Sequence, residues 1–381
     1  MGDPFRTVRR QMIDTGGEMR KERRGMKNEK RRIAIVGTGW RSEFYVRIAK
    51  ACPEMFELCG IWYHSEKGRA SAVKAGVPLF DSMDDIAKLK PDYAVVSLPG
   101  SAMIDALVFL SERGIPCLAE TFTLPDVQSM SDAYAKLKNA AVQVAEQYQF
   151  QPLNAARLMT AKSGVLGKIY HVRMSIPTRH HPASLVRMFL NTKDALPQIS
   201  AQKFMHKALK GPGRAGDPKK EEWFDAFHEI VTYDFGDVQA VNDFEDMQHR
   251  SFMRNNYFLV RGERGEIVNE HVSYMKDFMT PVEYDLKRVT AGSGVDLQGM
   301  FLRGVSGAQE GWLYYNRFIP ARLYDDELAV AECMYAMGEY IDEGKRFYGL
   351  NDALTDIYYA YLTEEAIKSG EKVHAQKQSW M

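Results

Sequence analysis

The chain has 381 residues, 45% hydrophobic and 26% charged, a composition typical of a folded globular protein of two or three domains. Fifty Lys and Arg balance fifty Asp and Glu, which argues against nucleic-acid binding through an overall basic charge. The four cysteines form no CxxC pair, and no apolar run reaches the roughly 20 residues of a membrane span. These features predict a cytoplasmic protein with neither a disulfide framework nor a thiolate zinc site, and with no nucleic-acid or membrane partner.

The first 31 residues differ from the rest of the chain. Between Met1 and Arg32 there are eleven Lys or Arg and five Asp or Glu, with little apolar periodicity. Such a segment is typical of a solvated, disordered tail. We therefore expect residues 1–31 to be a basic tail, with a binding arm as the other interpretation and Met26 as an alternative start.

Short apolar runs alternate with helical segments between residues 32 and 150. The first run, Ile33–Val36, is uninterrupted, as in parallel strands that are buried on both faces. Further strands are expected at residues 56–62, 93–97, 116–120 and 142–145. One helix is expected to end near residue 52, and others are expected at residues 66–75, 102–113 and 126–139. This alternation predicts βαβ units, and hence a parallel-sheet domain over residues 32–150.

The alternation stops after Phe150, and residues 151–381 follow another pattern. A helix at 153–163, a strand at 168–176, a loop at 211–220 and β-like segments between 238 and 272 precede closing helices at about 326–343 and 350–369. Apolar residues at helical spacing predict a further helix at 221–235, and His206 is expected on an exposed helix. The pattern predicts a second, α+β domain with a largely antiparallel open sheet.

A glycine-rich turn, GTGWRS, follows the first strand and opens a helix. Its first glycine permits a tight turn, and its second lets the backbone approach a pyrophosphate at the helix N-terminus. This setting predicts a dinucleotide site, so the fold class is α/β with an N-terminal Rossmann domain; an ordinary glycine-rich turn is the other interpretation. The expected cofactor contacts in the turn are Gly37, Thr38, Gly39, Trp40 and Arg41.

The end of the second strand indicates which dinucleotide binds. NAD sites usually place a carboxylate there for the ribose 2′-hydroxyl, but this sequence has Tyr63 at that position. His64, Ser65, Lys67 and Arg69 instead offer donors and positive charge for a 2′-phosphate, and Arg41 could join them. The expected cofactor is therefore NADP or NAD, with NADP favoured.

Several motifs, in a shared order along the chain, resemble the Gfo/Idh/MocA family, named after glucose–fructose oxidoreductase and inositol dehydrogenase. They are the GTGWRS turn, Ser97–Gly100 (SLPG), Ile115–Phe122 (IPCLAETF), Ser163–Ile169 (SGVLGKI) and the stretch from Asp225 to Val238. The resemblance runs from about Arg32 to Val373. It implies a sugar, a polyol or a related substrate, and cofactor contacts at Leu98, Pro99 and Glu120.

The resemblance also implies a catalytic set, formed by the Lys of a Glu-Lys-Pro motif and by an Asp and a His four residues apart on a helix. Here Thr121 stands in place of the Lys, and its hydroxyl does not titrate near neutrality. His228 matches the family His, but Asp225 precedes it by three residues rather than four. On the predicted helix both side chains share a face, so Asp225 could orient His228 as a general base. A structural histidine is the other interpretation.

Four further residues are weaker candidates for substrate binding. Arg179, His180 and His181 follow a strand and could hold a hydroxyl-rich or anionic substrate, with a polar loop as an equal alternative. Tyr148 lies just past the last strand of the Rossmann domain, where the chain should return to the nicotinamide. No metal site is predicted, because His180 and His181 would point apart on a strand and no HExxH or i,i+4 His pair occurs.

Together these features predict an NAD(P)-dependent oxidoreductase that transfers a hydride to or from a sugar-like or cyclic polyol substrate. The resemblance also implies that the protein forms a homodimer or homotetramer through the open face of its sheet. The missing Lys motivates an alternative from another class, a dinucleotide-binding sensor or regulator with little or no dehydrogenase activity. Reduction of a C=N or C=C bond is a third possibility, because it needs a proton donor but no Lys-paired base.

Overall fold

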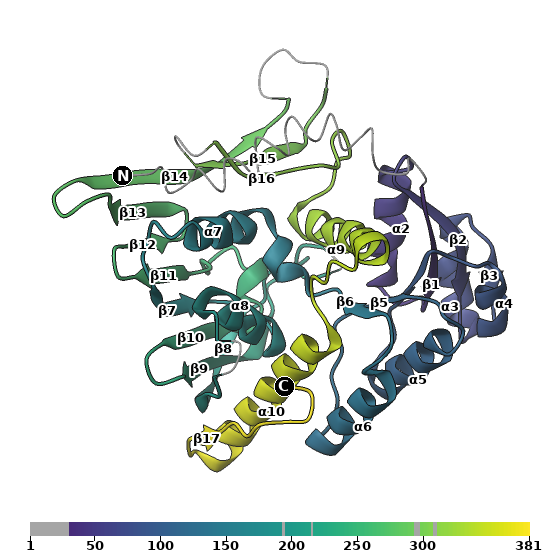
Figure 1. Cartoon of the computed structure of the whole chain (residues 1–381), viewed down its shortest axis with the longest axis horizontal. Coiled ribbons are helices and arrows are strands. Elements are labelled where there is room, and N and C mark those ends of the chain that lie inside the picture. Colours follow the sequence, from purple (N-terminus) through teal and green to yellow (C-terminus); the bar gives the residue numbers. More distant parts are fainter. Residues whose placement is uncertain (1–29, 193–194, 215, 293–297, 308–310) are drawn as a thin grey trace. The chain divides into compact units, whose positions relative to one another are not determined.

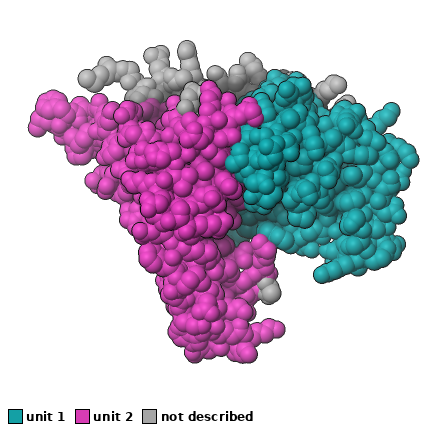
Figure 2. All heavy atoms as spheres, turned by 90° about the horizontal axis from the view of Figure 1, so that it is seen from below, with its two compact units in different colours: residues 1–156, 287–354, 380 teal, residues 157–286, 355–379, 381 magenta. Residues whose placement is uncertain are grey.

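The computed structural model describes residues 30–192, 195–214, 216–292, 298–307 and 311–381, so nearly all of the predicted basic tail, with Met26, lies outside the described residues. The described chain forms two compact units (Figure 2). Unit 1 comprises residues 30–156, 287–354 and 380, and unit 2 comprises residues 157–286, 355–379 and 381. Unit 1 thus includes a late segment, residues 287–354, that the sequence analysis placed with the C-terminal domain.

The core of unit 1 is a six-stranded sheet in the order β3-β2-β1-β4-β5-β6, in which every pairing is parallel (Figure 1). Its strands are β1 (Arg31–Val36), β2 (Phe56–Trp62), β3 (Leu79–Phe80), β4 (Tyr93–Val96), β5 (Cys117–Ala119) and β6 (Val142–Val144). Ile33 to Val36 are fully buried, because both faces of a parallel sheet are covered. The strand order reverses between β1 and β4, which is the switch point where such sheets bind dinucleotides.

Helices connect these strands and begin at local caps. They are α2 (Ser42–Ala51), α3 (Glu66–Ala72), α4 (Met83–Lys88), α5 (Gly100–Ser111) and α6 (Val127–Leu137), with 3-10 turns η1 (Val73–Ala75) and η2 (Gln147–Phe150). Ser65, Ser82 and Asp126 each accept a hydrogen bond from a first-turn amide, of α3, α4 and α6 respectively. The predicted alternation of strands and helices over residues 32–150 is confirmed.

The late segment of unit 1 includes a pair of strands and a long helix between the end of β14 (Pro281–Thr290) and the start of α10 (Leu350–Ser369). Strands β15 (Leu302–Gly307) and β16 (Gly311–Tyr315) pair antiparallel, and helix α9 (Asp325–Glu343) packs on α2 and η2. The positive end of a helix dipole favours acidic side chains in its first turn. The first turn of α9 carries three acids, Asp325, Asp326 and Glu327.

Unit 2 is built on an open sheet in the order β14-β13-β12-β11-β7-β10-β9-β8-β17, in which β7 and β10 pair in parallel and the other neighbouring strands pair antiparallel. The strands are β7 (Ile169–Met174), β8 (Gln198–Leu209), β9 (Trp223–Asp234), β10 (Gln239–Glu245), β11 (Phe258–Gly262), β12 (Gly265–Val268), β13 (His271–Met275), β14 (Pro281–Thr290, in unit 2 up to Leu286) and β17 (Val373–His374). The predicted, largely antiparallel C-terminal sheet is confirmed.

Helices cover one face of this sheet. Helix α8 (His180–Leu190) packs on β7 and β10, and Arg187 of α8 pairs at 2.8 Å with Asp356 in the unit 2 part of α10 (Leu350–Ser369). Helix α7 (Pro152–Lys162) leads from one unit into the other. On β9 the covered face buries Glu229, Val231 and Tyr233. Because side chains alternate along a strand, His228 and Ile230 point to the opposite face, which we call the open face.

The helix predicted at residues 221–235 is wrong, because this segment is strand β9. The strand lies between β8 and β10, and both of its faces carry large apolar side chains. Trp223, Phe227 and Ile230 therefore imitate helical spacing within an extended chain. His206 likewise lies on β8 and not on a helix. Among the described helices, none combines the length and apolar content that a membrane span requires.

Candidate functional site

The glycine turn of unit 1 joins β1 to α2, and its backbone requires the first glycine. Gly37 has a φ of +118°, which L side chains rarely adopt, and its amide donates to Trp62 O at 3.1 Å. A Cβ at this position would lie 2.3 Å from Ser97 O, so a side chain would push the turn away from β4. This is the tight turn that the sequence predicted.

The second glycine of the turn faces open space. A Cβ built on Gly39 would have no atom within 4 Å, and Arg41, the N-cap of α2, makes no side-chain cap hydrogen bond. The Ser42 hydroxyl beside it is buried without a hydrogen-bond partner among the described residues. An uncapped helix N-terminus beside an open glycine suits a pyrophosphate, because the backbone amides point at the anion. The residues present therefore fit a dinucleotide.

Arg41 turns into unit 1 and its side chain is only 11% exposed. Its Nε donates to Glu120 Oε1 at 2.8 Å and its Nη1 to Asp326 Oδ2 at 3.1 Å. Glu120, which follows β5, also accepts a hydrogen bond from the Tyr45 hydroxyl at 2.5 Å. In the orientation that satisfies both of its amide atoms, Gln147 accepts from Arg41 Nη2 at 3.0 Å. These five residues form what we call the Arg41 network.

Burial and nearby charges shift the pKa of two members of this network, Arg41 and Tyr45. Burial acts to lower the pKa of Arg41, but Glu120 and Asp326 outweigh it, so the pKa is raised and the guanidinium stays charged. The pKa of Tyr45 is raised well above its ordinary value, first by burial and then by Glu120, which keeps Tyr45 a neutral donor. The network therefore combines one cation, two carboxylates and neutral hydrogen-bonding groups.

The residues expected to select the cofactor follow β2. The Tyr63 amide donates to β3 at 2.9 Å, and Ser65 caps α3. His64 and Lys67 are exposed at the same end of the strand. The expectation that Arg41 joins them is wrong, because its guanidinium is held by carboxylates at the ends of β5 and α9.

The other predicted cofactor contacts surround the same turn. Leu98, after β4, lies beside the first glycine, and Pro99 is the N-cap of α5. The Thr38 hydroxyl faces the start of α3. Trp40 is 47% exposed, and its ring meets the edge of Phe44 at a centroid distance of 5.6 Å. All of these residues lie at the carboxyl edge of the parallel sheet, where a dinucleotide would be held.

Two further candidates of unit 1 follow β5 and β6. Thr121 directly follows Glu120 and is half-buried. Tyr148 lies in η2, is half-buried, and its carbonyl accepts from Asn154 Nδ2 at 3.0 Å. Both residues are therefore at the carboxyl end of the parallel strands, on the side of the sheet where β5 and β6 lie.

The expected pairing of Asp225 with His228 is wrong. Both residues lie on β9, where positions three apart point to opposite faces of the sheet. Asp225 is exposed and pairs with Lys207 at 2.7 Å. His228 Nε2 lies 2.6 Å from Asp243 Oδ1, and Asp243 Oδ2 also accepts from Arg173 Nη2 at 2.5 Å. A carboxylate from β10 thus holds His228 on the open face.

Arg179, His180 and His181 lie at the start of helix α8, where the sequence analysis expected a loop or strand. The two imidazole rings are in contact, with centroids 4.2 Å apart, so the expectation that they point apart is wrong. His181 is only 7% exposed. Arg179 donates to both carboxylate oxygens of Glu229, at 2.9 and 2.7 Å, and also pairs with Glu364. These contacts raise the pKa of Arg179, with the hydrogen bonds of Glu229 as the largest cause.

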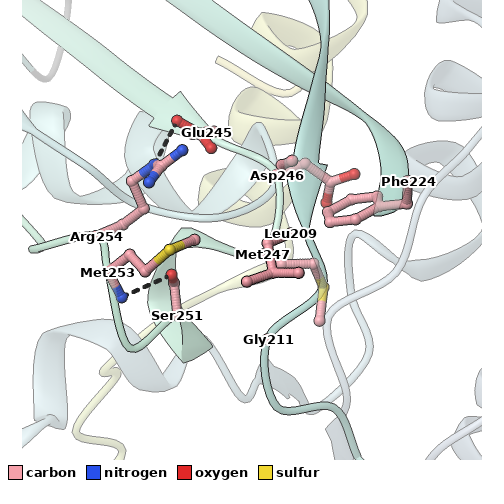
Figure 3. A pocket seen from close by; sticks show the side chains of 10 residues that line it. Leu209, Gly211, Phe224, Glu245, Asp246, Met247, Ser251, Met253 and Arg254 are labelled. Carbon is pink, nitrogen blue, oxygen red and sulfur yellow. Dashed lines mark hydrogen bonds and ion pairs between the residues drawn. The ribbon is translucent and has the colours of Figure 1, made fainter. Parts of the chain in front are cut away.

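A pocket in unit 2 contains none of the predicted site residues (Figure 3). Glu245 accepts a hydrogen bond from Arg254 Nε at 2.9 Å, so these two residues of opposite charge in the pocket lining pair with each other. Burial raises the pKa of Asp246, which faces the pocket beside Phe224. The lining residues are Ala208, Leu209, Gly211, Phe224, Glu245, Asp246, Met247, Ser251, Met253 and Arg254.

The sequence analysis missed several residues that hold the predicted ones in place. Tyr45 follows Arg41 by four residues in the sequence, a spacing that could have revealed it. Asp326 lies 285 residues from Arg41 in the sequence, and Glu229 lies 50 residues from Arg179. Contacts over such separations leave no local pattern, so only the structure reveals them.

A parallel sheet of this order, with a glycine turn and an uncapped helix at its switch point, defines a dinucleotide-binding protein of the Rossmann class. Residues 31–148 match the family model GFO_IDH_MocA, described as an oxidoreductase family with an NAD-binding Rossmann fold. Residues 31–148 therefore match the NAD-binding Rossmann domain of this oxidoreductase family, in agreement with the resemblance seen in the sequence. No curated protein matches the sequence.

Solved structures share the fold over most of the chain. A levoglucosan dehydrogenase in complex with NADH has a TM-score of 0.63 at 12% identity, covering 92% of this chain and 100% of that chain. A myo-inositol dehydrogenase from Corynebacterium glutamicum has a TM-score of 0.60 at 16% identity, with coverages of 92% and 100%. An apo scyllo-inositol dehydrogenase from Lactobacillus casei has a TM-score of 0.59 at 15% identity, with coverages of 92% and 99%. At these identities the likeness establishes the fold alone.

Proposed function

We propose that the protein uses a nicotinamide dinucleotide to transfer a hydride to or from a sugar-like or cyclic polyol substrate. The observation that carries this proposal is the turn of unit 1, which combines a glycine at φ +118° with an open glycine and an uncapped helix. The family match over residues 31–148 supports the chemistry, and similar folds that bear the names of inositol and levoglucosan dehydrogenases support the substrate class.

We assign the proton-handling role to His181 in place of His228. The family resemblance implies a histidine on a helix, and His181 lies at the start of α8, whereas His228 lies on a strand. An alcohol must lose its proton as its hydride leaves, so a buried imidazole next to the reacting hydroxyl lowers the barrier. Arg179 and His180, at the same helix start, are proposed to bind substrate hydroxyls. Thr121 and Tyr148 of unit 1 are kept as separate candidates for substrate contact.

A dinucleotide-binding protein with little or no dehydrogenase activity is the second candidate. Thr121 occupies the position of the family Lys, and Asp225 does not support His228, so two parts of the expected catalytic set are altered. Under this candidate the protein binds the cofactor but turns over no polyol. Turnover therefore separates the two candidates, whereas cofactor binding does not.

The test compares Gly39→Leu with Gly39→Ala. The open space beside Gly39 accepts a methyl group, but a Leu side chain would occupy the volume assigned to the pyrophosphate. We expect Gly39→Leu to weaken cofactor binding, measured by the quenching of Trp fluorescence, by more than about tenfold, with a smaller effect of Gly39→Ala. Unchanged affinity in a folded Gly39→Leu protein would rule out this site. Turnover by the wild type with a panel of sugars and inositols then distinguishes an enzyme from a sensor.

Two further proposals concern the whole protein. The four cysteines are free thiols, which agrees with the proposed cytoplasmic location. We also propose that the open face of the unit 2 sheet forms a homodimer or homotetramer, as the family resemblance implies. Light scattering of wild type and of a variant charged at Ile230, on that face, tests the assembly; an unchanged mass would contradict it.

A further inference from the structure

The Arg41 network carries more negative than positive charge. Arg41 supplies its one cation, and its guanidinium donates hydrogen bonds to the carboxylates of both Glu120 and Asp326. The side chains of Arg41 and Glu120 are 11% and 8% exposed, and that of Asp326 is 29% exposed. These side chains are largely shielded from solvent, so their charges are screened less than those on the surface.

The other acids of the α9 first turn have cations of their own. Asp325 forms two hydrogen bonds of 2.7 Å with Arg288, and Glu327 pairs with Arg47 at 2.5 Å. Asp326 instead shares Arg41 with Glu120, so within the network one carboxylate charge is left over. The positive end of the α9 dipole stabilises that charge without cancelling it.

The order of the sheet places this charge on the nicotinamide half of the cofactor site. A Rossmann sheet binds one mononucleotide over each half, and the ribose-recognition position at the end of β2 marks the adenosine half. The strands on the other side of the switch point are β4, β5 and β6. Glu120 directly follows β5, so the network lies under the nicotinamide half.

The two redox states of the cofactor differ in charge at this place. The nicotinamide ring of NAD⁺ is positive and that of NADH is neutral, so a fixed negative charge nearby favours the oxidised form. We propose that the Arg41 network, through the unbalanced carboxylate of Glu120 and Asp326, strengthens binding of the oxidised dinucleotide relative to the reduced one. This inference rests on the proposed function, since it needs a nicotinamide at the carboxyl end of β5.

The experiment measures the dissociation constants of NAD⁺ and NADH, and of NADP⁺ and NADPH, for the wild type and four variants of the full-length protein. Asp326→Asn and Glu120→Gln remove one charge from the network with little change of shape. Asp326→Glu keeps the charge. Asp325→Asn is the matched control. It also removes one negative charge, but at the neighbouring residue, whose carboxylate forms an exposed ion pair with Arg288. Thermal unfolding of each variant checks that it is folded.

We expect Asp326→Asn and Glu120→Gln each to shift the ratio of the two dissociation constants toward the reduced form by roughly three- to tenfold. Asp325→Asn and Asp326→Glu should leave the ratio near that of the wild type. Equal weakening of both forms by Asp326→Asn and Glu120→Gln would show that the network only supports the fold, and would overturn the proposal. An equal shift with Asp325→Asn would overturn it too. Failure of the wild type to bind any dinucleotide is a different outcome, because it refutes the proposed function itself.

Discussion

The glycine turn of unit 1 and the histidine-bearing segments of unit 2 differ in how directly their sequence determines their structure. At Gly37 a backbone φ of +118° and a neighbouring carbonyl leave no room for a side chain, so the motif and its geometry are inseparable. In unit 2, the helix predicted at residues 221–235 is strand β9, and the helix that carries histidines is α8. A backbone constraint thus identifies a site more securely than the spacing of apolar side chains.

The difference between the two regions changes which histidine is proposed to handle the proton. A motif match that assumed a helix selected His228, which points to the open face and is held by Asp243. The helix start of α8 provides His181, which is buried. His228 was selected by a match to a short sequence motif, whereas His181 is selected because it lies on a helix. Substitution of each histidine therefore compares the two criteria.

The largest effect is expected from His181→Asn. If His181 takes the proton of the substrate hydroxyl, its loss should lower kcat by about 100- to 10,000-fold and leave the dissociation constant of the cofactor unchanged. Steady-state kinetics with the best substrate of the panel, together with cofactor titration, measure both quantities. His228→Asn is the matched control. A larger loss of kcat in His228→Asn than in His181→Asn would reverse the assignment.

The second-largest effect is expected on the stability of the protein when the partner of Arg179, at the start of α8, is removed. Glu229 is buried and accepts two hydrogen bonds from Arg179, so Glu229→Ala leaves a guanidinium without its main partner. Removal of one member of a buried pair costs up to about 3–5 kcal/mol, and about 2 kcal/mol is expected here because Arg179 is 24% exposed and keeps Glu364. Urea unfolding measures the loss of stability.

The control for Glu229→Ala is Asp225→Asn on the same strand. Asp225 and Lys207 are both mostly exposed, so their ion pair contributes little to stability. A loss of stability in Asp225→Asn as large as that in Glu229→Ala would show that β9 is sensitive to any change, and not to the buried pair in particular.

The parts of the fold that the sequence predicts are those with local signals. Apolar runs such as Ile33–Val36 and the alternation around them identify the parallel sheet, and with it the carboxyl edge at which the proposed cofactor residues lie. The strand β9 was missed because both of its faces carry large apolar side chains, so its apolar residues do not alternate cleanly. The return of residues 287–354 to unit 1 was missed because it depends on packing between distant segments.

In the candidate site, too, some features have a local signal in the sequence and others do not. Gly37 and Gly39 are visible in the sequence because the turn needs them at fixed spacing. The commitment of Arg41 to Asp326 is not visible, because the partners are 285 residues apart and either could pair with many other charges. The sequence therefore predicts the backbone of the proposed cofactor site better than it predicts which charged side chains surround that backbone.

A smaller effect is expected for the choice between NAD and NADP. Without Arg41, the cations near Ser65 that could bind a 2′-phosphate are Lys67 and Arg69, with His64 as a donor. We expect NADP⁺ to bind more tightly than NAD⁺, and Lys67→Ala to weaken NADP⁺ by roughly three- to tenfold with little effect on NAD⁺. Titration of both dinucleotides at fixed, moderate salt measures this. Tighter binding of NAD⁺ by the wild type would refute the preference.

The smallest effect concerns His228 itself, which we expect to support the open face of the sheet. Burial acts to raise the pKa of Asp243, but hydrogen bonds from His228 and Arg173 outweigh it, so the pKa lies below the ordinary value of 3.8. A depressed folded-state pKa adds stability that is present above the unfolded value and is lost as the pH falls through the folded value. His228→Asn should therefore cost only about 0.5 kcal/mol near neutrality and should reduce the loss of stability below about pH 4. Urea unfolding at a series of pH values measures both, and an acid profile identical to that of the wild type would contradict the pairing of His228 with Asp243.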